Sequence, residues 1–244
     1  MPWDFWLIFL LLGFVIPWRG YARMRHLMAQ PEVTSRERIK MYFATIFFQW
    51  LLTALVAWRA FARGLSPRDL GIVHGVSLSL FVVTVLGAAV IGAAHWANVR
   101  RMAHSDHPNV QRLRALGSRL FPRTNSEMFL FVVLSVTAGI CEEFLFRGFV
   151  MGALFRVGLD AWLVVVVSSA MFGLAHLYQG KGGSVGTGIL GALFGSVRIV
   201  YQSLLPAAVW HTALDIVAGV AGARFLLGAP TSPADQPVLN EIHR

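Results

Sequence analysis

The sequence predicts an all-α membrane protein, a polytopic bundle of about seven transmembrane helices, with six to eight compatible with the pattern. Of the 244 residues, 56% are hydrophobic and only 14% are charged, whereas a soluble domain has about 25% charged residues. Mean hydropathy is +0.62. Several apolar runs are long enough to cross a bilayer, so the composition and the run lengths together argue against a soluble domain.

The charged residues are mostly arginine and give a net charge of +9. Because they are dispersed between apolar runs, and no aromatic–basic binding motif accompanies them, we predict contact with a lipid bilayer rather than with nucleic acid. The single cysteine, Cys141, excludes an internal disulfide framework.

Three spans are predicted in the N-terminal part of the chain, residues 1–125. The first is bordered by Trp3 and Trp18, whose rings favour the membrane interface. We expect this segment to be retained, because no basic region precedes it and no cleavage pattern of a signal peptide follows it. Basic loops at 19–40 and 98–125 contain six lysines or arginines each, and a surface helix is expected within the second loop, at 113–120. The predicted spans are Trp3–Ile16, Met41–Trp58 and Val76–Ala97.

A membrane core is predicted for residues 126–222. Ser126 is expected to cap a long helix that runs to about residue 155, since no proline interrupts it. Gly158 marks a turn, and the glycine-rich segment Gln179–Gly188 is predicted to be a flexible loop. Three more spans are predicted after the turn: Ala161–Leu177, Ile189–Val200 and Leu204–Ala221.

Loop charge predicts the orientation in the membrane. Most of the 21 lysines and arginines lie in the loops after the first, third and fifth predicted spans and in the C-terminal tail. Since basic loops stay in the cytoplasm, the N-terminus is expected outside and the C-terminus inside, in a multi-pass protein of a bacterial inner membrane. The tail, residues 223–244, is polar and proline-rich and is expected to be disordered.

Three charged residues interrupt the apolar run that carries the long helix. Glu142, Glu143 and Arg147 each cost at least about 2.5–3.5 kcal/mol at a helix centre in a membrane, so each needs a partner inside the bundle. Glu143 and Arg147 are four residues apart and share a helix face, which predicts a structural ion pair. Glu142 is rotated by about 100° from Glu143 and is left without a partner.

Two histidines on other apolar segments are candidate partners for Glu142. Glu142 lies 16 residues before Gly158 and His176 lies 18 residues after it, so the two reach similar depths in an antiparallel hairpin. His211 and Asp215 are four residues apart, which predicts an imidazole oriented by a carboxylate.

These residues form three ordered motifs: Glu142-Glu143-x-x-x-Arg147, Phe172-x-x-x-His176 and His211-x-x-x-Asp215. Over residues 126–221 the set resembles the CAAX prenyl protease and bacteriocin-processing family, also called the abortive-infection family. The first three spans carry no such resemblance.

The resemblance implies a glutamate-type intramembrane endopeptidase with no metal or cofactor. Its substrate would be a membrane-associated protein or peptide, including one with a prenylated or anchored C-terminus. Glu142 and His176 would activate a water, and His211 with Asp215 would stabilise the oxyanion. Supporting roles would fall to Glu143, Arg147 and Phe172. Oxyanion donors in a dry cavity are worth roughly 3–4 kcal/mol each.

Asp215 departs from the family pattern, which has Asn or a small polar residue four positions after the histidine. An ionised Asp repels an oxyanion, whereas Asn donates a hydrogen bond to it. The resemblance therefore requires that Asp215 hold a protonated His211 or be neutral itself.

Other functions remain open for the same residues. Glu142, His176 and His211 could hold Zn²⁺ in a membrane hydrolase. The polar cluster could instead be the core of a non-catalytic immunity or scaffold protein, or a proton relay in a transporter, although no repeat halves are visible. The loop cluster His104-x-Asp106-His107 lacks a third firm ligand, which disfavours a metal site there.

Overall fold

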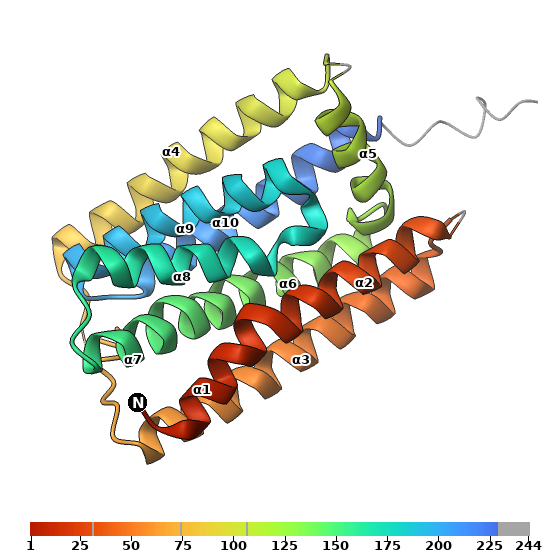
Figure 1. Cartoon of the computed structure of the whole chain (residues 1–244). Helices are drawn as coiled ribbons and strands as arrows, with labels where there is room; N and C mark the ends of the chain where they lie inside the picture. The colour runs from red at the N-terminus through yellow and green to blue at the C-terminus, as the bar shows by residue number, and fades with distance from the viewer. Residues whose placement is uncertain (31, 74, 106, 229–244) are drawn as a thin grey trace, which may run out of the picture.

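A computed structural model describes residues 1–228 except 31, 74 and 106. Within this part of the chain, six helices are long and apolar enough to cross a membrane, and a shorter apolar helix, α8 (Ala161–Ala175), runs beside them (Figure 1). The chain is an all-α, multi-pass membrane bundle, which confirms the predicted fold class.

The first membrane helix is longer than predicted. Three consecutive segments form it: α1 (Trp3–Leu10), the π-helical η1 (Leu11–Val15) and α2 (Ile16–Ala29). Pro17 lies in the first turn of α2 without ending the helix, because the π-helical segment before it supplies the backbone adjustment that a proline needs within a membrane helix. The predicted basic loop at 19–40 is therefore wrong over most of its length, since residues 19–29 and 35–40 are helical.

The next three helices are α3 (Ser35–Ala62), α4 (Leu78–Met102) and α5 (Pro108–Leu120). Thr34 and Glu37 form a capping box at the start of α3, in which the Thr34 hydroxyl accepts from the Glu37 N–H and the Glu37 carboxylate accepts from the Thr34 N–H. Ser77 caps α4. Helix α5 crosses one end of the bundle (Figure 1), which confirms the surface helix predicted there.

The helix with the two adjacent carboxylates consists of α6 (Asn125–Glu143), the π-helical η2 (Phe144–Val150) and α7 (Met151–Arg156). Its N-cap is Thr124, not Ser126 as predicted, because Thr124 has the extended backbone that a cap requires and its hydroxyl accepts from the Glu127 N–H at 3.3 Å. The turn at Gly158 is confirmed, with a φ of +83° that favours glycine.

The glycine-rich segment after α8 is helical, so the loop predicted at Gln179–Gly188 is wrong. It comprises η3 (Leu177–Gln179), Gly180 with a φ of +89°, and the start of α9 (Lys181–Tyr201). Small residues allow α8 and α9 to approach closely: a Cβ on Gly173 would lie 2.8 Å from the Ser184 carbonyl oxygen. This packing overrides the low helix propensity of the glycines. The predicted sixth span is thus the C-terminal half of α9.

The described part of the chain finishes with α10 (Leu205–Ala221) and the π-helical η4 (Gly222–Leu226). The disordered tail predicted at 223–244 is therefore wrong at residues 223–226, because η4 continues the helix of α10, and residues 229–244 lie outside the described residues. Helix α6 contacts both α3 and α10, while α8 packs on α9 and α10 packs on α4. A Cβ on Gly139 would lie 2.6 Å from the Ala208 carbonyl oxygen, so α6 and α10 meet at backbone distance. This close approach brings His211 beside the paired carboxylates.

A buried ion pair ties three helices together at the end of the bundle that α5 covers. Arg38 on α3 donates through Nη1 to both carboxylate oxygens of Glu127 on α6, at 3.1 and 3.2 Å. Its other nitrogens donate to the carbonyl oxygens of Val33, Ser118 and Arg119. A buried pair is tolerated when such additional bonds satisfy its remaining donors, and here they hold α5 in place.

Candidate active site

The carboxylate of Glu142 faces two imidazoles across a narrow gap. Its Oε2 lies 3.9 Å from Nε2 of His176 and 4.0 Å from Nε2 of His211. Its Oε1 accepts a hydrogen bond from Nε2 of Gln49 on α3 at 2.7 Å. The depth match predicted from the turn at Gly158 is therefore confirmed, because the two side chains meet.

The imidazole of His176 is held by the backbone of its own helix. Nδ1 lies 2.9 Å from the carbonyl oxygen of Phe172, which can only accept, so Nδ1 carries a proton and Nε2 is directed at Glu142. The 3.9 Å separation from Glu142 is too long for a direct hydrogen bond and suits contact through a water. The ring also contacts those of Phe172 and Tyr178, with centroids 4.7 and 5.8 Å away.

Glu143 connects the two remaining charged groups. Its Oε1 accepts from Nη1 of Arg147 at 2.9 Å and lies 2.9 Å from Nδ1 of His211. The side chains of Glu143 and Arg147 are fully buried. The ion pair predicted between them is confirmed, and the same carboxylate also orients an imidazole.

This arrangement corrects the expectation that Asp215 orients His211. The Oδ2 of Asp215 lies 3.7 Å from Nε2 of His211, beyond hydrogen-bond distance, while Nδ1 of His211 is bonded to Glu143. Helical spacing placed His211 and Asp215 on one face but did not determine which ring nitrogen faces α6. Nε2 of His211 is thus directed at both Asp215 and Glu142.

Aromatic rings cover the buried guanidinium of Arg147. Its Cζ lies 4.1 Å from the ring centroid of Phe172 and 5.5 Å from that of Phe194. Such cation–π contacts offset part of the desolvation of an arginine in a membrane. A Cβ on Gly191 of α9 would come within 2.9 Å of Nη2 of Arg147 and 3.2 Å of the Ser169 Cα, so a larger residue there would crowd the guanidinium. Phe172 packs within the site, as expected of a supporting residue.

One comparison with known proteins identifies this region. Residues 124–217 match the family model for type II CAAX prenyl endopeptidases of the Rce1-like kind. Residues 124–217 are thus similar to an Rce1-like domain. The match confirms the resemblance seen in the three motifs and encloses every residue of the site except Gln49. No curated protein and no solved structure matches the chain.

Family and fold together define the general class of the protein. The Rce1-like match over residues 124–217 supports a membrane protease in general, and the six long apolar helices among the described residues make the chain an integral, multi-pass membrane protein. The Rce1-like domain begins one residue before α6 and ends within α10. It therefore contains the helices that carry all three motifs.

No geometric feature of the described residues favours a metal ion. Across residues 1–228, with 31, 74 and 106 left aside, no three His, Cys, Asp or Glu side chains are arranged to hold one. The zinc alternative at the Rce1-like site thus gains no support from side-chain placement. The cluster at 104–107 falls partly outside the described residues, since Asp106 is not among them.

Gln49 is the polar side chain bonded to Glu142 that sequence reasoning missed. It is the one amide in the apolar run Phe43–Trp58, and polar groups within membrane helices tend to be functional, so a signal was present. The motifs lie in α6 and η2, at the end of α8 and in α10, and helical spacing within those segments says nothing about which residue of α3 faces them. The contact with Glu142 follows from the packing of α3 on α6.

We expect Gln49→Leu to lower kcat for peptide hydrolysis by about tenfold or more, because a hydrogen bond to a charged group contributes about 1.5–3 kcal/mol. The variant keeps the side chain's size and leaves Oε1 of Glu142 without its donor. Steady-state kinetics in detergent measure the effect. Thr45→Val is the matched control, since the Thr45 hydroxyl donates to the Met41 carbonyl of its own helix and to no other described residue. Wild-type kcat in Gln49→Leu would show that this contact does not position Glu142.

Proposed function

We propose that the protein is a glutamate-type intramembrane endopeptidase that hydrolyses a peptide bond with a water activated by Glu142 and His176. The observation that carries the proposal is the gap in which Oε2 of Glu142 faces Nε2 of His176 at 3.9 Å. A water placed there would donate one hydrogen bond to the carboxylate and lie within reach of the imidazole.

The reaction follows from these positions. Glu142 takes a proton from the water while the oxygen of the water bonds to the carbonyl carbon of the peptide. The π electrons of the carbonyl group move onto its oxygen, which becomes the oxyanion. When this intermediate collapses, the C–N bond breaks and Glu142 returns its proton to the leaving amine. His176 orients the water through Nε2, since its Nδ1 proton is committed to the Phe172 carbonyl.

His211 is the oxyanion donor in this scheme. Glu143 on Nδ1 and Asp215 near Nε2 flank the ring with two carboxylates, an arrangement suited to an imidazolium. An imidazolium Nε2–H directed into the gap donates to the oxyanion, and such a donor in a site closed to bulk water contributes roughly 3–4 kcal/mol. Asp215 thereby supports a charged His211 rather than contacting the oxyanion itself.

The proposed setting is the inner membrane of a bacterium, with the N-terminus outside and the C-terminus in the cytoplasm. The end of the bundle covered by α5 would then face the cytoplasm, consistent with the basic residues concentrated there. The substrate is a membrane-associated protein or peptide, with a prenylated or anchored C-terminus among the candidates. The protein requires no metal or cofactor and binds no nucleic acid in this proposal.

Cleavage in the presence of a chelator tests the proposal against the zinc alternative. The purified protein in liposomes is incubated with membrane-anchored and prenylated peptides, and the products are identified by mass spectrometry. We expect one hydrolysed peptide bond and the same rate with or without 1,10-phenanthroline. Activity lost to the chelator and restored by Zn²⁺ would instead establish a metal hydrolase. Intact peptides across the whole set would contradict the protease proposal.

A further inference from the structure

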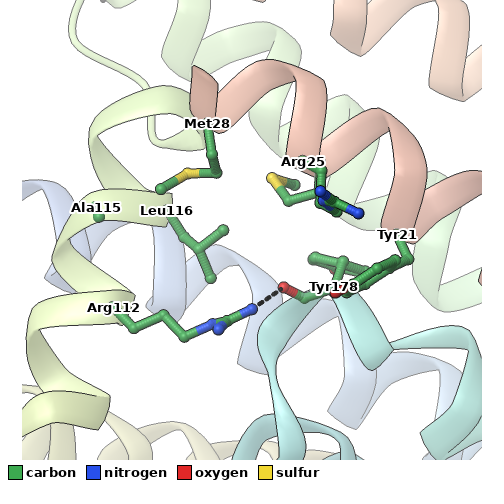
Figure 2. A pocket seen from close by; sticks show the side chains of 8 residues that line it. Tyr21, Arg25, Met28, Arg112, Ala115, Leu116 and Tyr178 are labelled. Atoms are coloured by element: carbon green, nitrogen blue, oxygen red, sulfur yellow. Dashed lines mark hydrogen bonds between the residues drawn. The ribbon is translucent and has the colours of Figure 1, made fainter. Parts of the chain in front are cut away.

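A cavity of about 350 Å³ lies between α2, α5 and η3. Its volume falls within the range of small-ligand sites, roughly 300–1,000 Å³. Met24, Met28 and Leu116 give it an apolar floor, and α5, which crosses one end of the bundle in Figure 1, forms one of its sides (Figure 2).

Two arginines make this cavity basic. Arg25 on α2 and Arg112 on α5 line it, and none of the eight lining residues is acidic. Nη2 of Arg112 donates to the Tyr178 carbonyl oxygen at 3.4 Å, which directs that guanidinium toward the cavity (Figure 2). Both arginines are exposed, and Arg25 has no hydrogen-bond or ion-pair partner among the described residues. The cavity therefore suits an anionic group attached to an apolar body.

The cavity adjoins the proposed catalytic gap. Tyr178 forms part of its wall, and the centroid of the Tyr178 ring lies 5.8 Å from that of the His176 ring. An extended peptide advances about 3.3–3.6 Å per residue, so a chain cut beside His176 reaches the cavity within a few residues. Because Tyr178 both lines the cavity and contacts the His176 ring, a segment of the substrate is favoured as the occupant over a lipid headgroup.

We propose that this cavity binds a carboxylate of the substrate peptide, a few residues from the cleaved bond, between Arg25 and Arg112. The guanidinium fork matches a carboxylate in two parallel hydrogen bonds, while the apolar floor accepts the residue that bears it. The carboxylate is either the peptide's C-terminus or an Asp or Glu side chain. This inference rests on the proposed function, since it names what the same site recognises.

Matched peptides distinguish the two sources of the carboxylate. One set ends in a free acid or an amide, and a second set carries Glu or Gln at each position near the cleaved bond. Binding of labelled peptides to the full-length protein in an uncharged detergent is measured by fluorescence anisotropy. We expect wild type to bind one carboxylate form about tenfold more tightly than its neutral counterpart. The set that shows the preference identifies the source.

Variants of the two arginines test whether the preference for the acid form of the peptide arises in this cavity. Arg25→Gln, Arg112→Gln and the double variant are compared with Arg23→Gln, an exposed α2 residue that does not line the cavity. The double variant is expected to bind acid and neutral peptides equally, with each single variant in between and Arg23→Gln like wild type.

An acid preference that persists in the double variant overturns the inference, as does a wild type with no preference. If the double variant differs from wild type only in vesicles containing anionic lipid, the cavity is a headgroup site and the inference is overturned.

The binding measurement and the cleavage measurement test the two proposals separately. The anisotropy measurement does not require turnover, so the acid preference decides the inference about the cavity. The mass-spectrometric assay decides the proposed function. Peptides that bind with the acid preference and remain intact contradict the protease proposal alone.

Discussion

Glu142→Gln is expected to abolish peptide hydrolysis, with kcat reduced by about 10²–10⁴-fold or more, the range that general acid–base catalysis contributes. The amide has the size of the carboxylate, and its oxygen still accepts from Gln49. It takes no proton from a water, however, and returns none to a leaving amine. Because the change is isosteric, the helices around it retain their packing.

The measurement is kcat in liposomes, accompanied by Tm in detergent to verify the fold. Glu32→Gln is the control, since Glu32 is exposed and lies outside the site. Hydrolysis by Glu142→Gln at the wild-type rate would eliminate the glutamate mechanism. Loss of that hydrolysis in His176→Ala would then show that the site works without Glu142, whereas its persistence would indicate a non-catalytic cluster and a contaminating protease.

Glu143→Gln is expected to lower the free energy of unfolding by about 3–5 kcal/mol, because it leaves the charge of Arg147 buried without its partner. The double variant Glu143→Leu/Arg147→Met removes both charges and fills a similar volume, so it recovers much of the stability. It nevertheless stays inactive, because Nδ1 of His211 has lost the carboxylate that orients the ring. Stability and activity are thereby separated.

Unfolding by SDS titration in mixed micelles measures these differences. Arg59→Gln is the control: its partner Asp4 is also bonded to Arg63, and the Arg59 side chain is partly exposed, so a loss of only about 0.2–1 kcal/mol is expected. A Glu143→Gln variant as stable as this control would refute the structural role of the pair. A double variant with wild-type activity would refute the orienting role of Glu143.

The sequence predicted what depends on local spacing and on the cost of charge in a membrane. Glu143 and Arg147 paired because four residues complete about one helical turn. Glu142 met His176 because both are nearly equidistant from the Gly158 turn. The match of residues 124–217 with the Rce1-like family agrees with the motifs, which are themselves local patterns.

Helix ends were predicted less well where packing outweighs propensity. The chain continues as helix through Pro17, where a π-helical segment absorbs the strain. It is also helical from Lys181, where glycines allow α9 to lie against α8. Propensity disfavours a helix at both places, and neighbouring helices supply contacts that a single segment cannot reveal.

The sequence alone determines the membrane location, the buried ion pair of Glu143 with Arg147 and the contact of Glu142 with His176. It does so because hydropathy and the helical period act within one helical hairpin. The contact of Gln49 with Glu142, the bond of Glu143 to His211 and the basic cavity beside Tyr178 arise between helices distant in sequence. Those contacts depend on how each helix is rotated about its axis, and the rotation is set by side-chain packing against neighbours.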